Sequence, residues 1–129
     1  MALNKDRNTP IRVGDSVIHP VAAGAKIYAG ALVAINAAGF AVPGSSSSNL
    51  VAVGRADKRI DNLGGLDGNQ AVRVRRGIFQ YANAGGSITR ADIGKNCFIA
   101  SDYGVSKTGN SVAGKVIDID DGGVWVEMG

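Results

Sequence analysis

The sequence has 129 residues, a formal net charge of +3 and a hydrophobic fraction of 45%. This length suffices for one hydrophobic core but not for two, and the mild positive charge is far below the single-sign bias of a dedicated nucleic-acid-binding protein. A glycine count of 19 and an aromatic content of 5% favour a turn-rich β architecture over a helical bundle. The single cysteine excludes an intrachain disulfide, and the sequence has neither an apolar run of membrane-spanning length nor a signal-peptide core. We therefore expect a soluble, single-domain protein.

The first predicted element, residues 1–20, is a polar N-terminal arm. Pro10 and Pro20 interrupt it, and apolar residues such as Ile11 and Val13 alternate only briefly. A segment of this kind buries too little apolar surface to offset its chain entropy, so it is either mobile or laid on another surface, for example as an added strand. We expect an arm over residues 1–20 and a β-domain over residues 21–129.

Short apolar segments separated by turns predict the strands that follow the arm. The first three strands are expected at residues 32–35, 40–42 and 50–53. Gly39 suits the left-handed corner of the first hairpin turn, and residues 44–49, GSSSSN, form a flexible connector. A long polar loop over residues 58–70 then leads to the next strand.

That next strand, residues 71–83 or AVRVRRGIFQYAN, is the expected centre of the sheet. Apolar side chains occupy even positions before Gly77 and odd positions, such as Phe79, after it. Because a β-strand has a period of two, this change of phase predicts a β-bulge at Arg76-Gly77, where glycine can adopt a positive φ. We expect a long, bent central strand.

The remaining chain is predicted to form one helical turn and then hairpin strands. Thr89 and Asp92 have the spacing of a capping box, and Gly94 ends the turn. The later strands are expected at residues 97–100, 112–119 and 124–128, with a tight turn at Asp121-Gly122.

The two halves of the chain are similar in the order of their segments, which indicates a degenerate duplication. Residues 32–42 correspond to 97–107, residues 50–57 to 111–118, and residues 72–77 to 124–129. The halves differ between their second and third segments, where the first half carries the long loop and the second has only a tight turn.

Few residues offer catalytic or ligand chemistry. His19 is the one histidine and has no acid or nucleophile near it in sequence, and Cys97 lies in an apolar strand where a thiol acts as a small hydrophobe. Asp118, Asp120 and Asp121 lack the spacing of a calcium loop and instead indicate a hairpin turn. We expect no enzyme activity, no cofactor and no metal site.

Basic residues gather in the strands and the loop around the predicted central strand. They are Arg55, Lys58, Arg59, Arg73, Arg75 and Arg76. Arginine alternating with valine gives a strand one dry face and one cationic face, which is either solvated or a contact surface for phosphates or carboxylates. Stacking aromatic residues are scarce nearby, so a protein partner is favoured over a nucleic acid.

Four stretches of the chain carry a resemblance to a known family. They are AGALVAINAAGFAVPG, VAVGRADKRIDN, VRVRRGIFQYAN and AGKVIDIDDGGVWVEM. Over residues 21–129 the chain resembles the head decoration, or cement, proteins of tailed, Mu-like bacteriophages. The resemblance rests on strand and turn patterns.

The resemblance implies an all-β fold, a β-sandwich or small β-barrel of short antiparallel strands that forms trimers or other small oligomers. It implies binding to the major capsid protein on the outer surface of the virion head, after synthesis in the bacterial host cytoplasm, and no catalytic residues. The capsid-contact candidates are Ile11 and Val13 of the arm together with the six basic residues named above. A phage tail or baseplate component and a small nucleic-acid-binding barrel are the alternatives.

Overall fold

The computed structural model describes residues 2, 4–8 and 14–129, which form short β-strands and two 3₁₀ turns. The elements are β1 (Ser16–Pro20), β2 (Lys26–Ile27), β3 (Leu32–Ile35), β4 (Ala41–Pro43), β5 (Val51–Ala56), β6 (Ile60–Asp61), β7 (Ala71–Arg75), β8 (Gly77–Asn83), η1 (Ala84–Gly86), η2 (Arg90–Asp92), β9 (Asn96–Ile99), β10 (Gly104–Ser106), β11 (Val112–Asp120) and β12 (Gly123–Met128). The expected all-β fold is confirmed. In the described part of the chain no helix is long and apolar enough to cross a membrane.

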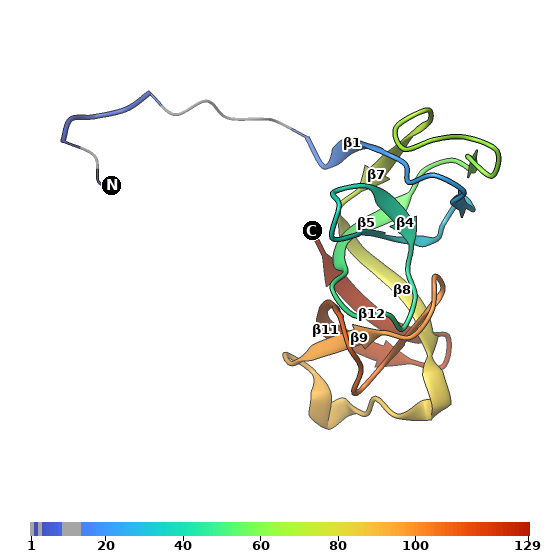
Figure 1. Ribbon diagram of the computed structural model, residues 1–129. Coiled ribbons are helices and arrows are strands. Elements are labelled where there is room, and N and C mark those ends of the chain that lie inside the picture. The colour runs from blue at the N-terminus through green and yellow to red at the C-terminus, as the bar shows by residue number, and fades with distance from the viewer. Residues whose placement is uncertain (1, 3, 9–13) are drawn as a thin grey trace.

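The strands form two five-stranded units and one short pair. The first unit is a sheet with the order β1-β7-β5-β3-β4, and the second is a closed barrel with the order β10-β8-β12-β11-β9. The strands β2 and β6 pair separately beside the first unit. Figure 1 shows the first sheet above the barrel, with the chain passing between them in the yellow segment.

That passage lies at the predicted phase change. β7 pairs with β1 and β5 in the sheet, whereas β8 pairs with β12 and β10 in the barrel, and Arg76 lies between the two strands. Gly77 has a φ of 151°, as expected for a glycine at this point. The change of phase is therefore confirmed, but the predicted bulge in one continuous strand is wrong. The chain passes from the sheet to the barrel at this point, so β7 and β8 belong to different units.

The two units have the same strand order once β1, β7, β5, β3 and β4 are matched with β8, β12, β11, β9 and β10. The barrel closes where β10 runs parallel to β8, with Val105 opposite Asn83. In the first unit a parallel bridge joins Val21, directly after β1, to Ala41 of β4. Both units thus bring together the same two strands in the same direction, which supports the interpretation as a duplication.

The pairing of residues between neighbouring strands also agrees between the sheet and the barrel. Gly54 lies opposite Val33 beside a register shift in the sheet, and Gly114 lies opposite Cys97 beside a register shift in the barrel. By this register Cys97 is the counterpart of Val33, so the predicted match of residues 32–42 with 97–107 was wrong by one residue. The match of residues 50–57 with 111–118 was wrong by one residue for the same reason. The third match is correct, because Val74 and Val126 occupy equivalent positions.

The loop that distinguishes the halves lies where the sequence placed it, between β5 and β7. Its β6 pairs with β2, and the buried side chain of Asn62 donates hydrogen bonds to the carbonyl oxygens of Ala22 at 2.9 Å and Leu66 at 3.0 Å. In the second half, β11 and β12 are joined by the expected tight turn, with Asp120 opposite Gly123.

Buried side chains form two clusters, so the expectation of one hydrophobic core is wrong. One cluster fills the barrel and the other lies within the first sheet. β3 contributes to both, because Leu32 and Ala34 pack in the barrel cluster while Val33 packs in the sheet cluster. A strand buried on both faces lets two small units stabilise each other.

The predicted helical turn is present as η2. The Thr89 backbone N–H donates to Asp92 Oδ2 at 2.9 Å, and the two residues form the expected capping box. These bonds to the carboxylate lower the pKa of Asp92.

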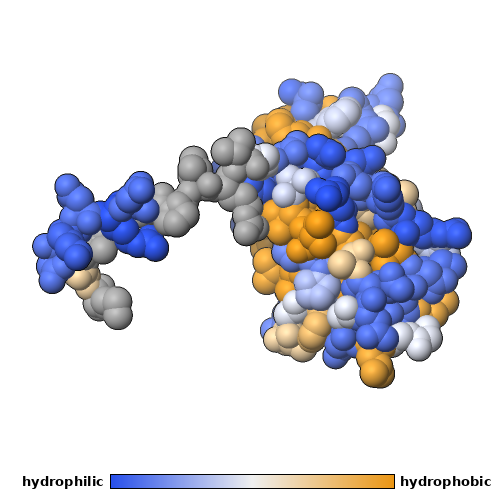
Figure 2. Space-filling model, turned by 90° about the horizontal axis from the view of Figure 1, so that it is seen from above, coloured by the Kyte–Doolittle hydropathy of each residue, from blue (hydrophilic) through white to orange (hydrophobic). Residues whose placement is uncertain are grey.

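The predicted arm is shorter than expected, because its last residues belong to the sheet. Residues 16–20 form β1 and pair antiparallel with β7 over their whole length. This pairing is the added-strand alternative, made within the chain. Residues 4–8 are exposed, and Figure 2 shows the hydrophilic residues of this part of the arm standing apart from the body. Ile11 and Val13 lie outside the described residues.

Candidate binding surface

The outer face of the first sheet carries three of the six predicted basic residues. Arg73 and Arg75 alternate with the buried residues Val72 and Val74 along β7. Arg55 of β5 lies directly opposite Arg75. The period of two in a strand therefore puts these three arginines on one face, as the sequence indicated.

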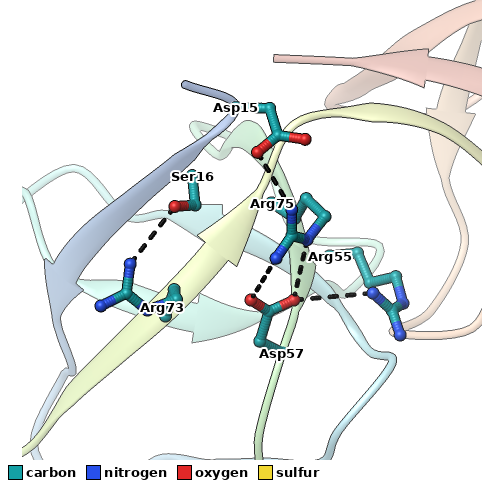
Figure 3. A network of polar contacts seen from close by, with 6 residues as sticks. All are labelled: Asp15, Ser16, Arg55, Asp57, Arg73 and Arg75. Atoms are coloured by element: carbon teal, nitrogen blue, oxygen red, sulfur yellow. Dashed lines mark hydrogen bonds and ion pairs between the residues drawn. The ribbon is translucent and has the colours of Figure 1, made fainter. Parts of the chain in front are cut away.

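Arg75 is the centre of a network of polar contacts on this face (Figure 3). It donates from Nε and Nη2 to the two carboxylate oxygens of Asp57 at 3.3 and 3.2 Å, and from Nη1 to Asp15 Oδ1 at 3.0 Å. The hydrogen bonds to Asp57 and the negative charge of Asp15 raise the pKa of Arg75. The two-bond contact with Asp57 fixes the orientation of the planar guanidinium group.

Arg55 contacts both a carboxylate group and an aromatic ring. Its Nη1 lies 3.6 Å from Asp57 Oδ1, and its guanidinium carbon lies 5.6 Å from the centre of the Phe79 ring. Phe79 belongs to β8, so this contact joins the first sheet to a barrel strand. Arg55 therefore contributes to the packing of the two units.

Arg73 is exposed and has a different environment. Its Nη1 donates to the hydroxyl group of Ser16 at 3.3 Å. The side chain also lines a groove of about 270 Å³ together with residues of β1 and of the long loop. Arg73 thus lies at one end of the network, and this end borders the groove.

The other predicted candidates are distributed around this face. Lys58 lines the same groove as Arg73, and Arg59 is exposed in the turn before β6. Arg76 lines different grooves, which it shares with Gly129. The structure therefore gathers Arg55, Arg73 and Arg75, places Lys58 at their border and separates Arg76 from them.

Sequence reasoning missed the acidic residues of the network. Asp57 follows Arg55 by two residues and so shares its face, a signal that the strand period provided. Asp15 had no such signal, because β1 was assigned to the arm. Its contact with Arg75 depends on the pairing of β1 with β7.

Cys97 and Asp120, for which the sequence indicated no catalytic or ligand chemistry, make contacts within the fold. Burial raises the pKa of the Cys97 thiol to about 11, and the thiol lies 3.6 Å from the carbonyl oxygen of Gly114. Asp120 accepts hydrogen bonds at 2.8 Å from Trp125 Nε1 within the predicted hairpin and from Gln80 Nε2 of the neighbouring β8. These contacts lower the pKa of Asp120. The described residues contain no cluster of His, Cys, Asp and Glu that could hold a metal ion.

Comparisons with protein-family models, with curated proteins and with solved structures find no match to the chain. The interpretation of this surface therefore depends on its own geometry.

Proposed function

We propose that this protein is a decoration, or cement, protein of a tailed bacteriophage head, which binds the major capsid protein on the outer surface of the shell and stabilises it. The observation that supports this most strongly is the attachment of the arm to the body. The exposed residues 4–8 precede, along the chain, a strand that is fixed to the sheet by both backbone and side-chain bonds.

The bonds at the base of the arm come from three sources. β1 forms five residue pairs with β7, from Ser16 opposite Arg75 to Pro20 opposite Ala71. The carbonyl oxygen of Asp15 accepts a hydrogen bond from the Arg76 N–H at 2.6 Å, and the Asp15 carboxylate contacts Arg75. The base of the arm is therefore held by several backbone and side-chain bonds together, which suits a segment that holds a neighbouring subunit.

The charges of the outer face favour a protein partner over a nucleic acid. Asp57 and Asp15 contact Arg75, and Asp57 also contacts Arg55, so part of the cationic charge is balanced within the chain. A phosphate-binding surface requires uncompensated cations whose binding releases counterions. A partly balanced surface instead suits a partner with a few carboxylates and apolar side chains.

We also propose that copies of the chain associate, with a trimer favoured. Val51 is 64% exposed and Val112 is 42% exposed, and both line a groove of about 530 Å³ between the starts of β5 and β11. Exposed apolar side chains around a groove are common at contacts between protein chains. Light scattering at high micromolar concentration should show a trimer, and monomers alone would contradict self-association in solution.

A sedimentation assay tests the proposed function. The protein is mixed with expanded heads that lack their decoration protein, with unexpanded heads, with tails and with duplex DNA. We expect it to pellet with expanded heads and to remain in the supernatant with the other three. Pelleting with tails would support the tail component, and DNA binding that falls steeply with salt would support the nucleic-acid-binding barrel.

A further inference from the structure

The groove beside Arg73 has both apolar walls and cationic groups. Its lining residues are Ile18, Asp57, Lys58, Ile60, Ala71 and Arg73, and its volume is about 270 Å³. Ile18 is 56% exposed although it lies in a strand next to Arg73. An exposed isoleucine in the middle of a paired strand leaves apolar surface for a ligand to cover.

Arg73 retains the capacity to bind a carboxylate. A guanidinium group has five N–H donors, and the Ser16 hydroxyl accepts from one of its nitrogens. Arg75, by comparison, directs three nitrogens at Asp57 and Asp15. Among the arginines of the network, Arg73 is thus the one that lines the groove and has N–H donors available for a ligand.

The acidic residues near the groove are already engaged. Both carboxylate oxygens of Asp57 accept bonds from Arg75, and Arg55 lies beside them. Asp61 follows Ile60 and accepts a hydrogen bond from the Leu63 N–H at 3.0 Å. Asp57 is the one carboxylate among the described lining residues and is paired with Arg75 and Arg55, whereas Asp61 does not line the groove, so the lining charges of Lys58 and Arg73 exceed the negative charge there.

We propose that this groove binds an acidic segment of a protein partner. One apolar side chain of the segment packs between Ile18 and Ile60, and a carboxylate next to it meets Arg73 and Lys58. The proposal rests on the proposed function in taking the partner to be a protein, and it adds the chemistry that the partner must present. The apolar walls of the groove form no favourable contact with a phosphate group. A carboxylate next to an apolar residue therefore fits the groove better than a phosphate does.

A peptide titration followed by NMR tests the groove directly. The full chain is titrated with acetyl-Glu-Leu-Glu-amide and, as a matched probe of opposite charge, with acetyl-Lys-Leu-Lys-amide. We expect the acidic peptide to shift the methyl signals of Ile18 and Ile60, and the shifts to weaken as salt rises. Equal shifts with both peptides, or shifts confined to another surface, would overturn the proposal.

Two substitutions refine this test. Arg73→Gln should weaken the acidic peptide on the order of tenfold, as the loss of hydrogen bonds between charged groups implies, whereas Arg73→Lys should weaken it less. Lys115→Gln removes one positive charge from an exposed position of the barrel and should leave the affinity unchanged. An Arg73→Gln variant that binds like the original chain would contradict the assigned role of Arg73.

The failure of this proposal can be told apart from the failure of the proposed function. If the chain pellets with expanded heads but the peptide leaves the groove unaffected, the groove assignment is wrong and the head-binding function remains. If the peptide binds in the groove but the chain does not pellet with expanded heads, the proposed function is wrong and the groove assignment remains. A chain lacking residues 1–14 should bind the peptide with unchanged affinity, and tighter binding would show that the arm occupies the groove.

Discussion

Gly54 and Gly114 are the residues at which the two halves agree most closely in physical detail. A Cβ atom added to Gly54 would collide with the carbonyl oxygen of Arg75, and one added to Gly114 would collide with the carbonyl oxygen of Glu127. Arg75 and Glu127 occupy equivalent positions on β7 and β12. Both halves therefore use a glycine to let the neighbouring strand approach closely.

Replacing either glycine should destabilise the protein. Gly54→Ala and Gly114→Ala should each lower the free energy of unfolding by about 1–3 kcal/mol, because the neighbouring backbone must move. Gly64→Ala, where an added Cβ meets nothing within 4 Å, is the control and should stay within about 0.5 kcal/mol. Urea denaturation measures all three, and a Gly114→Ala variant as stable as the control would contradict the equivalence of the two positions.

His19 provides a prediction about pH. It lines an apolar groove, and burial lowers its pKa from the ordinary value of 6.5. Because the folded state disfavours the charged imidazole, the stability that the neutral form provides is complete above about pH 6.5 and is lost as the pH falls through the folded pKa. The protein should therefore be less stable at pH 5.5 than at pH 7.5, and His19→Gln should reduce that difference.

The measurement is chemical denaturation of both chains at the two pH values. Asp92 and Asp120 have lowered pKa values and stay ionised throughout this range, so they do not obscure the effect. An identical pH dependence in the original chain and in His19→Gln would show that His19 is not responsible.

Among the elements, β3 shows what the sequence revealed and what was overlooked. Its residues LVAI were predicted as a strand, and three of them are almost completely buried on alternate faces. A continuous apolar run indicates burial on both faces, which was a signal for two cores. The expectation of a single core came from chain length. Chain length alone does not indicate that one strand can be shared by two clusters.

The passage from β7 to β8 shows a different limit. Side-chain alternation located the phase change, because it depends only on which residues share a face. It gave no information on strand partners, since many Val- and Ala-rich segments could pair equally well. The two-residue strands β2 and β6 were too short to leave a pattern, and β1 was hidden by its position between prolines and polar residues.

Gly77 tests the interpretation of this passage. Gly77→Val should cost about 1–3 kcal/mol of stability, because a side chain is forced into a backbone conformation that it rarely adopts. Gly64→Val in the long loop is the matched control and should cost much less. If the two variants melt at the same temperature, the backbone at Gly77 is not strained and the account of the passage is wrong.

The boundary of the arm can be tested by truncation. Removal of residues 1–14 should leave the body folded, because β1 and its pairing with β7 remain. Removal of residues 1–20 should cost at least about 3 kcal/mol, because it removes the hydrogen bonds of β1 and uncovers apolar residues beside Val72 and Val74. Circular dichroism melts distinguish the two, and equal melting temperatures would contradict the inclusion of β1 in the sheet.

At the scale of the whole molecule, the structure combines a body of two packed units with exposed residues near the N-terminus. The two units have the same strand order and are joined by β3, which packs in both clusters, and by the contact between Arg55 and Phe79. The sequence predicted the all-β fold, the duplication, the inserted loop and the clustering of arginines. It did not predict the balancing carboxylates, since these depend on contacts between segments that lie far apart in the chain.

The proposed role follows from this combination. A body of two packed units and an arm that is fixed to it at β1 can contact two neighbouring subunits together. Each contact can be weak, because many copies act on adjoining subunits of the same shell. Removal of residues 1–14 should therefore reduce retention on expanded heads while the body stays folded.

A cryo-EM reconstruction of virions that carry the protein, compared with virions that lack it, tests the central claim most directly. The account predicts extra density on the outer surface of the head, into which the sheet and the barrel fit, with the arm reaching a capsid subunit. Extra density confined to the tail or baseplate, or virions that are identical with and without the protein, would contradict it.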